Sequence, residues 1–176
     1  MLLSYTELCH LAETGVISGV RDGAINASSI DIHLAPKVLV ESPRGGVVSY
    51  RDRRPLAMWE FDCADGIELN PGEFILASSV EVFNLPEDIS CEYKLKSSMA
   101  RIGLEHLNAG WCDAGWNGSV LTLELKNVTR YHAIRLMAGD PIGQMVFFRH
   151  AAVPKDKSYA YRGRYNGDLS AEGIKL

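Results

Sequence analysis

The sequence has no long apolar run and no excess of positive charge. None of its apolar stretches approaches the roughly 20 residues that a membrane-spanning helix needs, and the start, MLLSYTELCH, becomes polar too soon for a signal peptide. The net charge of −4 argues against massed cations on a surface that binds polymeric nucleic acid. We therefore expect a cytoplasmic protein with no membrane segment and no polymeric nucleic-acid partner. One phosphorylated small molecule would need far fewer cations.

The usual signatures of bound zinc are also missing. The four cysteines, Cys9, Cys63, Cys91 and Cys112, are scattered and include no C-x-x-C pair, so we expect buried thiols rather than a zinc knuckle or a redox motif. The five histidines lie singly, with no H-E-x-x-H helix. A Walker loop, a dinucleotide fingerprint and the H-x-E with P-C-x-x-C pattern of zinc deaminases are all absent.

What is present indicates a mainly β protein. A length of 176 residues suits a single domain, 1–176. Ser4 and Glu7 have the form of a capping box, which predicts one short N-terminal helix ending near Gly15. Short runs rich in Val, Ile, Leu and Phe, broken by Gly and Pro, then favour a barrel or sandwich. The expected strands lie within 28–34, 37–42, 46–50, 73–83, 119–125, 132–137 and 142–148.

Two segments have no core periodicity. Residues 43–66 are irregular and charged, which predicts a surface loop or lid. Residues 155–176 are polar and rich in glycine and tyrosine. This tail is either a frayed terminus or a C-terminal arm or lid over a ligand that carries phosphates and a ring.

Three stretches contain candidate functional residues. In GSVLTLELKN, 118–127, alternation puts Glu124 on the face opposite Leu121, Leu123 and Leu125, where it is either solvated or opposite a ligand. In KLKSSMARIGL, 94–104, Lys96, Ser97, Ser98 and Arg101 put two hydroxyls and two cations within six residues. This set suits a phosphate chain, although an N-capped helical turn would have the same residues. In NAGWCDAGWNG, 108–118, glycines allow a close approach to a ligand and Asp113 can accept from a sugar hydroxyl.

Several stretches together resemble one family, the dCTP deaminases, relatives of the trimeric dUTPases. The similar segments are ASSIDIHL, LNPGEFILASSVEVFNLPEDI, KSSMARIGL, AGWCDAGWNG, LTLELKN, IGQMVF and GRYNGD. They follow the family's order over about 24–34 and 67–169, which makes the set more specific than any one motif. The resemblance implies a distorted β-barrel or jelly-roll of the dUTPase-like type with a short N-terminal helix, assembled as a homotrimer with active sites between subunits.

The same resemblance implies a chemistry. It is the zinc-independent hydrolytic deamination of dCTP, or of a closely related cytosine deoxynucleotide, to dUTP and ammonia. Glu124 matches the catalytic glutamate, a general base and then acid, while Ser98 positions the water and Arg101 lies near the reacting centre. Metal enters only as Mg²⁺ bound through the triphosphate. The implied substrate contacts are Lys96, Ser97, Ser98, Met99, Ala100, Arg101, Ala109, Asp113, Trp116, Thr122, Leu123, Glu124, Gln144, Tyr159, Arg164 and Asp168.

The sequence also departs from the family pattern. The interval from Asp113 to Glu124 is one residue longer, so we expect a bulge within 117–120 that keeps Glu124 on the outer face. Asn108 replaces a common threonine near the base, which leaves a modified cytosine open as the substrate. Asp168 replaces a tail glutamine, and its carboxylate would repel phosphates unless Mg²⁺ or Arg intervenes. Leu95 stands where glycine often precedes the motif lysine.

Three other functions remain open. A bifunctional enzyme would carry dCTP through to dUMP and diphosphate, with Asp113 orienting a second water toward the phosphate. A pure dUTPase is disfavoured, since its R-G-S-x-G-F-G-S-T-G tail is missing and Glu124 would have no role. A noncatalytic relative that senses nucleotides would not need Glu124, Ser98 and Arg101 together.

Overall fold

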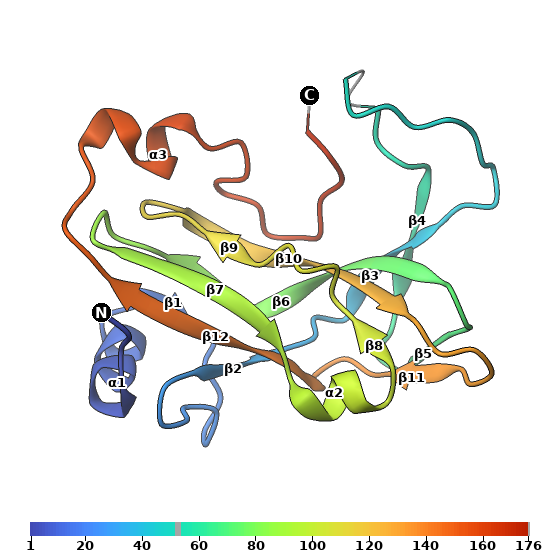
Figure 1. The fold of residues 1–176 in the computed structure, drawn as a ribbon, viewed down its shortest axis with the longest axis horizontal. Coiled ribbons are helices and arrows are strands. Elements are labelled where there is room, and N and C mark those ends of the chain that lie inside the picture. The colour runs from blue at the N-terminus through green and yellow to red at the C-terminus, as the bar shows by residue number, and fades with distance from the viewer. Residues whose placement is uncertain (52–53, 176) are drawn as a thin grey trace.

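The computed structural model describes residues 1–51 and 54–175 (Figure 1). Residues 52, 53 and 176 belong to the expected loop and arm and lie outside the described residues. The helices are α1 (Tyr5–Glu13), α2 (Ser97–Arg101), α3 (Tyr159–Arg162) and the 3₁₀ turn η1 (Lys155–Lys157). The strands are β1 (Ile17–Ser18), β2 (Ile30–His33), β3 (Lys37–Glu41), β4 (Met58–Asp62), β5 (Ile67–Leu69), β6 (Phe74–Asn84), β7 (Ile89–Leu95), β8 (Leu104–Glu105), β9 (Trp111–Cys112), β10 (Asn117–Asn127), β11 (Ile134–Leu136) and β12 (Pro141–Arg149).

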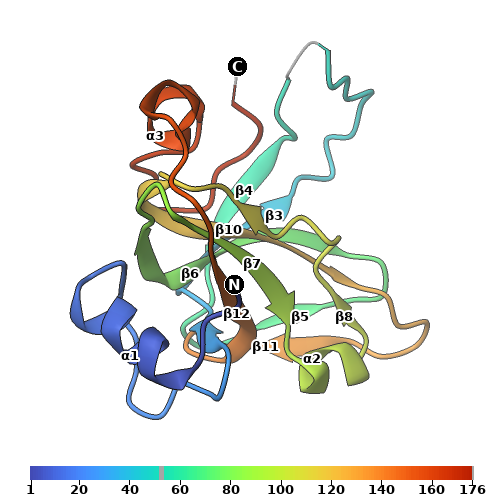
Figure 2. The ribbon, with the colours of Figure 1, turned by 60° about the vertical axis from the view of Figure 1, so that its left-hand side comes forward.

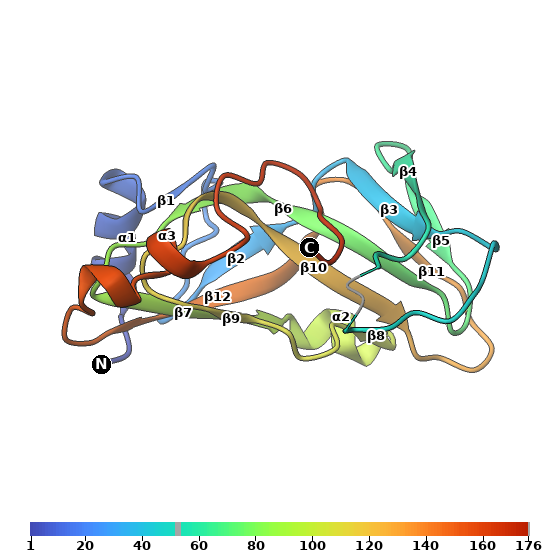
Figure 3. The ribbon, with the colours of Figure 1, turned by 90° about the horizontal axis from the view of Figure 1, so that it is seen from above.

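Two antiparallel sheets form the body of the protein, which confirms the mainly β fold that the sequence predicted. The larger runs β4-β3-β6-β10-β8, with β1 also paired to β6, and the smaller runs β2-β12-β7-β9. A separate pair joins β11 to β5. Viewed from above, the long strands β6 and β10 cross the molecule with the C-terminal segment over β10 (Figure 3). No helix among the described residues is long and apolar enough to cross a membrane.

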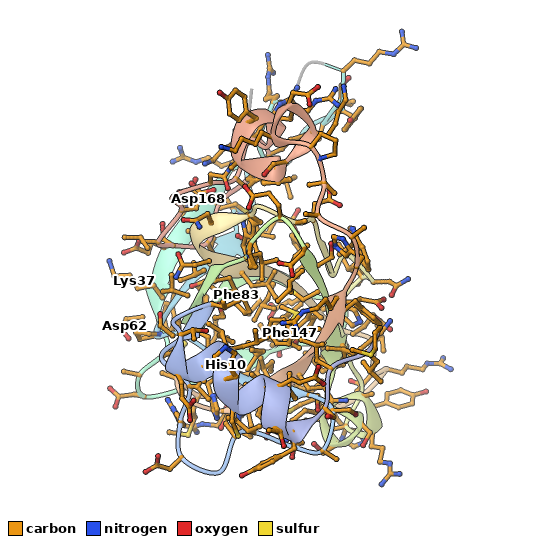
Figure 4. The ribbon with its side chains drawn as sticks, turned by 90° about the vertical axis from the view of Figure 1, so that its left-hand side faces the viewer. His10, Lys37, Asp62, Phe83, Phe147 and Asp168 are labelled. Carbon is orange, nitrogen blue, oxygen red and sulfur yellow. The ribbon has the colours of Figure 1, made fainter. Side chains whose placement is uncertain are left out.

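The core lies between the two sheets. Phe83 of β6 and Phe147 of β12 are both fully buried and come from opposite sheets; both lie inside the body behind α1, the helix that carries His10 (Figure 4). In α1 the predicted capping box is confirmed: the Ser4 N–H donates to Glu7 Oε2 at 3.0 Å. The helix buries its Leu8 and Leu11 against this core.

One buried polar pair joins the sheets. Glu81 of β6 is fully buried, and its two carboxylate oxygens meet the backbone N–H of His33 at 3.0 Å and the ring Nδ1 of His33 at 2.7 Å. His33 belongs to β2 in the other sheet. A buried carboxylate is stable only when it is paired and hydrogen-bonded, so this contact holds the two layers in one relative position.

Tyr93 packs into the core beside a glycine. A Cβ built on Gly143 of β12 would lie 2.1–2.4 Å from the ring and hydroxyl of Tyr93, closer than any real contact. The ring of His106 meets the Tyr93 ring edge-on, with centroids 5.2 Å apart. The Tyr93 side chain therefore occupies the space that any residue larger than glycine at position 143 would need.

Some expected elements were wrong. The strand expected at 46–50 is a loop ending in a turn: Val47 and Tyr50 are exposed, and no strand of the described part of the chain pairs with this segment. Conversely, the expected irregular segment 43–66 contains β4, which pairs with β3. The sequence analysis also did not anticipate β7, whose polar residues alternate with Cys91 and Tyr93. Of the four thiols expected to be buried, Cys9 is only half-buried.

Candidate active site

Glu124 lies on the outer face of β10, where alternation placed it. Leu121, Leu123 and Leu125 are buried in the core, whereas Glu124 is half-buried on the opposite face. The expected bulge is present: Asn117 pairs with Asn84 and Ser119 with Phe83. Gly118 between them has no partner across the strands and a φ of 67°, a conformation that favours glycine. The extra residue is thus absorbed before Glu124, and the faces of the strand are kept.

The carboxylate of Glu124 opens into a cavity of about 400 Å³. β10 forms its floor, the 111–116 turn forms one wall, and parts of the 48–58 segment and the C-terminal tail close it. In two views the C-terminal segment and β4 lie on the same side of the molecule, above β10 (Figures 1 and 2). The lining residues are Val48, Arg54, Leu56, Met58, Phe74, Leu76, Trp111, Cys112, Asp113, Trp116, Val120, Leu121, Thr122, Glu124, Tyr159, Tyr165, Asp168, Glu172, Gly173 and Ile174.

The 111–116 turn places one acid and two indoles at the cavity. Trp111 Nε1 donates to Asp113 Oδ1 at 2.8 Å, which fixes the orientation of that carboxylate. Trp116 is mostly buried, stacks on Phe83 with centroids 5.1 Å apart, and donates through Nε1 to the Tyr165 carbonyl at 2.7 Å. The turn is therefore anchored both to the core and to the tail.

Burial controls the charge of Glu124. Desolvation raises the pKa of this carboxyl above its ordinary value, and a hydrogen bond from backbone only partly opposes the rise. No side chain among residues 1–51 and 54–175 donates a hydrogen bond to it. Within one chain, desolvation is therefore the largest influence on the pKa of Glu124. A carboxylate with a raised pKa accepts a proton more readily.

The C-terminal tail folds over the floor of the cavity. Glu172 N donates to Thr122 Oγ1 at 3.3 Å, and the Val120 N–H donates to the Asp168 carbonyl at 2.8 Å. Lys175 pairs with Asp168 Oδ1, while Asp168 Oδ2 is buried without a partner among the described residues. Burial also raises the pKa of Tyr159. The tail is therefore ordered against its own chain rather than frayed.

The predicted phosphate-binding residues do not line the cavity that holds Glu124. Ser97 and Ser98 are exposed on α2, and Arg101 lines a separate hollow with Thr129 and His132. Lys96 Nζ meets Asp31 Oδ2 at 2.5 Å. α2 lies at the side of the molecule opposite the C-terminal segment (Figure 1). A single chain therefore gathers Asp113, Trp116, Thr122, Glu124, Tyr159 and Asp168 at one cavity and leaves the α2 group apart from it.

The remaining predicted residues do not line the cavity either. Leu123 points its side chain into the core, so it can offer only its backbone. Gln144 lies on β12 opposite Asp31, in the neighbourhood of Lys96. Met99 packs partly against the core, whereas Ala100, Ala109 and Arg164 are exposed.

The sequence analysis missed two features of the site. One is the contribution of Arg54, Leu56 and Glu172 to the cavity; the lid expected over 43–66 indicated the first two in general terms. The other is Tyr93, whose hydroxyl is buried with no partner among the described residues. Burial is the main cause that raises the pKa of Tyr93, and the charge of the Glu124 carboxylate adds to the rise. No sequence pattern distinguishes this tyrosine from an ordinary core residue.

Comparison with known proteins decides the family. A family model described as dCTP deaminase-like matches residues 2–150. The chain belongs to the dCTP deaminase-like family. A relative from Methanoculleus marisnigri is 40% identical over 129 residues, 72% of this chain and 68% of that protein. One from Methanosphaerula palustris is 35% identical over 151 residues, 85% of this chain and 80% of that protein. Both family members carry the name dCTP deaminase, dUMP-forming.

Solved structures show the fold of the dCTP deaminase-like family. The crystal structure of 2'-deoxycytidine 5'-triphosphate deaminase from Agrobacterium tumefaciens matches 83% of this chain with a TM-score of 0.67 at 22% identity. The chain spans about half the length of that protein, 48%. A dUTPase from phage phi11 of S. aureus matches 78% of the chain with a TM-score of 0.50 at 14% identity. The protein therefore has the mainly β, dUTPase-like fold that the sequence predicted.

Proposed function

We propose that this protein hydrolyses dCTP to dUMP, ammonia and diphosphate, without zinc. The observation that carries the proposal is the half-buried Glu124 carboxylate in a cavity that also holds Asp113 and Trp116. The names of the relatives, which are dUMP-forming, favour this bifunctional activity over the deamination to dUTP alone that the sequence first suggested. Deamination to dUTP alone is the second candidate.

In the first step Glu124 acts on water. The carboxylate takes a proton as the water oxygen bonds to C4 of cytosine, and returns it to N3 of the ring. The tetrahedral intermediate then breaks the C4–N4 bond, and ammonia leaves after it takes the proton of the new hydroxyl group. The raised pKa of Glu124 supports this role, because it brings the basicity of the carboxylate closer to that of the groups with which it exchanges protons.

In the second step Asp113 orients a water toward the phosphate. Its Oδ1 is held by Trp111 Nε1, which leaves Oδ2 free to accept from water or from the deoxyribose hydroxyl. Attack on the α-phosphorus breaks its bond to the bridging oxygen and releases diphosphate. We expect Mg²⁺ to enter as the complex with the triphosphate, because this ion is usually bound through substrate phosphates.

A second copy of the chain would complete the site. The described cavity lining carries four carboxylates, Asp113, Glu124, Asp168 and Glu172, against one cation, Arg54. A triphosphate would be repelled there without further positive charge. The exposed α2 residues Ser98 and Arg101 supply hydroxyl and cation if α2 of a neighbouring subunit covers the cavity mouth. This arrangement is the trimer with shared sites that the family resemblance implies.

The direct test is product analysis. Wild-type protein with Mg²⁺ and dCTP should release ammonia and yield dUMP with diphosphate on chromatography, whereas dUTP as the end product would support the deaminase-only candidate. Glu124→Gln should reduce turnover by about 10²–10⁴-fold while it keeps nucleotide affinity. Glu68→Gln, an exposed acid in β5, is the matched control and should keep full turnover. If Glu124→Gln were as active as that control, the mechanism would be wrong.

Mixing two inactive variants tests the shared site. Glu124→Gln and Arg101→Ala each destroy a different half of every site. If the two halves come from different chains of a trimer, random reassembly of equal amounts restores about a quarter of wild-type activity, because a quarter of the sites combine both intact residues. No recovery after denaturation and joint refolding would place both halves in the same chain.

A further inference from the structure

Two buried thiols face each other directly behind the wall of the candidate active site. Cys91 of β7 and Cys112 of β9 are register partners in an antiparallel pair, and both are free and buried. Cys112 also lines the cavity, between Trp111 and Asp113. The spacing of the two cysteines along the chain showed no redox motif, because it is the β7–β9 pairing that brings them together.

The pair is close to the geometry of a disulfide but not yet in it. Directly opposed residues of an antiparallel pair have Cβ atoms about 4.5–5.5 Å apart, whereas a disulfide needs about 3.5–4.5 Å. β9 has only two residues and lies at the edge of its sheet. A shift of about one ångström in this short edge strand would therefore allow the bond.

We propose that Cys91 and Cys112 are a redox modification site, in which a peroxide that enters the cavity converts the two thiols into a cross-strand disulfide. Cys112 reacts first, because it lines the cavity. Its sulfur gives up the thiol proton and bonds to one peroxide oxygen, the O–O bond breaks, and a water molecule is released, so that Cys112 becomes a sulfenic acid. The Cys91 sulfur then bonds to the Cys112 sulfur and displaces the hydroxyl as a second water. The two thiols lose two electrons and two protons, and one hydrogen peroxide becomes two waters.

The environment of each thiol fits this order. Burial raises the pKa of Cys91 well above its ordinary value, and the neighbouring Cys112 adds to the rise. Because the thiolate is the form that attacks peroxide, the raised pKa disfavours Cys91 as the first residue to react and leaves it as the resolving residue. Cys112 Sγ also lies 3.9 Å from the Gly110 carbonyl, a weak contact that a small movement of β9 can break.

The disulfide would affect the candidate active site through a movement of β9. Trp111 and Asp113 flank Cys112 in the chain, and the hydrogen bond between them orients the Asp113 carboxylate. Drawing β9 toward β7 moves this pair relative to Glu124. If the proposed function holds, oxidation should lower dCTP turnover by roughly tenfold to a hundredfold, because small displacements of catalytic groups cost rates of that size.

The test begins with wild-type protein and hydrogen peroxide. After treatment and unfolding, a thiol reagent should count two free cysteines, Cys9 and Cys63. The untreated chain should give four. Peptide mapping should find Cys91 linked to Cys112, with a mass about 2 Da below that of the two reduced peptides together. Dithiothreitol should restore both thiols and the turnover of dCTP. In Cys91→Ala, dimedone should trap a sulfenic acid at Cys112.

The thiol count and the activity separate the two proposals. Four thiols after peroxide, or a linkage that involves Cys9 or Cys63, would overturn the redox site whatever the enzyme does with dCTP. A Cys91–Cys112 linkage in a protein that never releases ammonia would leave the redox site standing and overturn the proposed function. The double variant Cys9→Ser/Cys63→Ala is the control, and should still lose its two remaining thiols to one disulfide.

Discussion

Removing the buried Glu81 carboxylate should destabilise the fold far more than removing an exposed one. Glu81 is fully buried and meets His33 through both oxygens, at 3.0 and 2.7 Å. Glu81→Ala leaves the His33 N–H and the imidazole without partners between the two sheets. Each hydrogen bond to a charged group contributes about 1.5–3 kcal/mol, and breaking a buried pair from one side costs about 3–5 kcal/mol.

This free-energy loss converts into a measurable melting shift. For a chain of this length each kcal/mol lowers the midpoint by about 2–4 °C, so Glu81→Ala should melt about 6–20 °C below wild type. Glu60→Ala is the matched control: it also removes a carboxylate at 2.7 Å from a cation, Lys37, but both side chains are more than half exposed. Circular dichroism melts at one protein concentration compare the variants. Equal midpoints for Glu81→Ala and Glu60→Ala would refute the role of the buried pair.

Three further predictions concern the site. Because burial raises the pKa of Glu124, the folded state binds its proton more tightly than the unfolded chain, so stability falls as pH rises through the window above the ordinary value of 4.5. Glu124→Gln should therefore resist denaturant better than wild type at neutral pH and equal it near pH 4; equal curves at both pH values would contradict this. Tyr93→Phe removes a buried hydroxyl without a partner among the described residues, so its unfolding free energy should stay level or rise by up to about 1 kcal/mol, and a loss above about 2 kcal/mol in urea titrations would reveal a partner. Truncation before Tyr159 removes part of the cavity lining and the carbonyl that accepts from Trp116, so KM for dCTP should rise and tryptophan emission should shift to the red; unchanged kinetics and emission would show that the tail does not cover the site.

Hydrophobic periodicity and turn residues correctly predicted the N-terminal helix and the strands β2, β3, β6, β10, β11 and β12. The face of Glu124 and the capping box at Ser4 follow from local rules about neighbouring residues, whereas the bulge at Gly118 was expected from the extra residue relative to the family pattern. The strand at 46–50 failed, since β-branched residues form a strand only where another strand can pair with them. β7 was missed for the opposite reason, because its pairing with β12 and β9 depends on residues distant in the chain.

The sequence predicted which residues belong to the candidate site, but not how they are arranged in space. The resemblance named the residues, and the fold brings six of them to one cavity: Asp113, Trp116, Thr122, Glu124, Tyr159 and Asp168. Within one chain Lys96, Ser98 and Arg101 do not line this cavity. The lid function of 155–176 and the trimer stay predictions.

The tight contact between Tyr93 and Gly143 restricts the order in which these two positions can change. With tyrosine in place, even a methyl group at 143 collides with the phenol ring. A smaller residue at 93 must therefore come first, and only then can the glycine be replaced. Related sequences should accordingly show a bulky residue at one of the two positions but never at both, and mutational libraries should vary the two together.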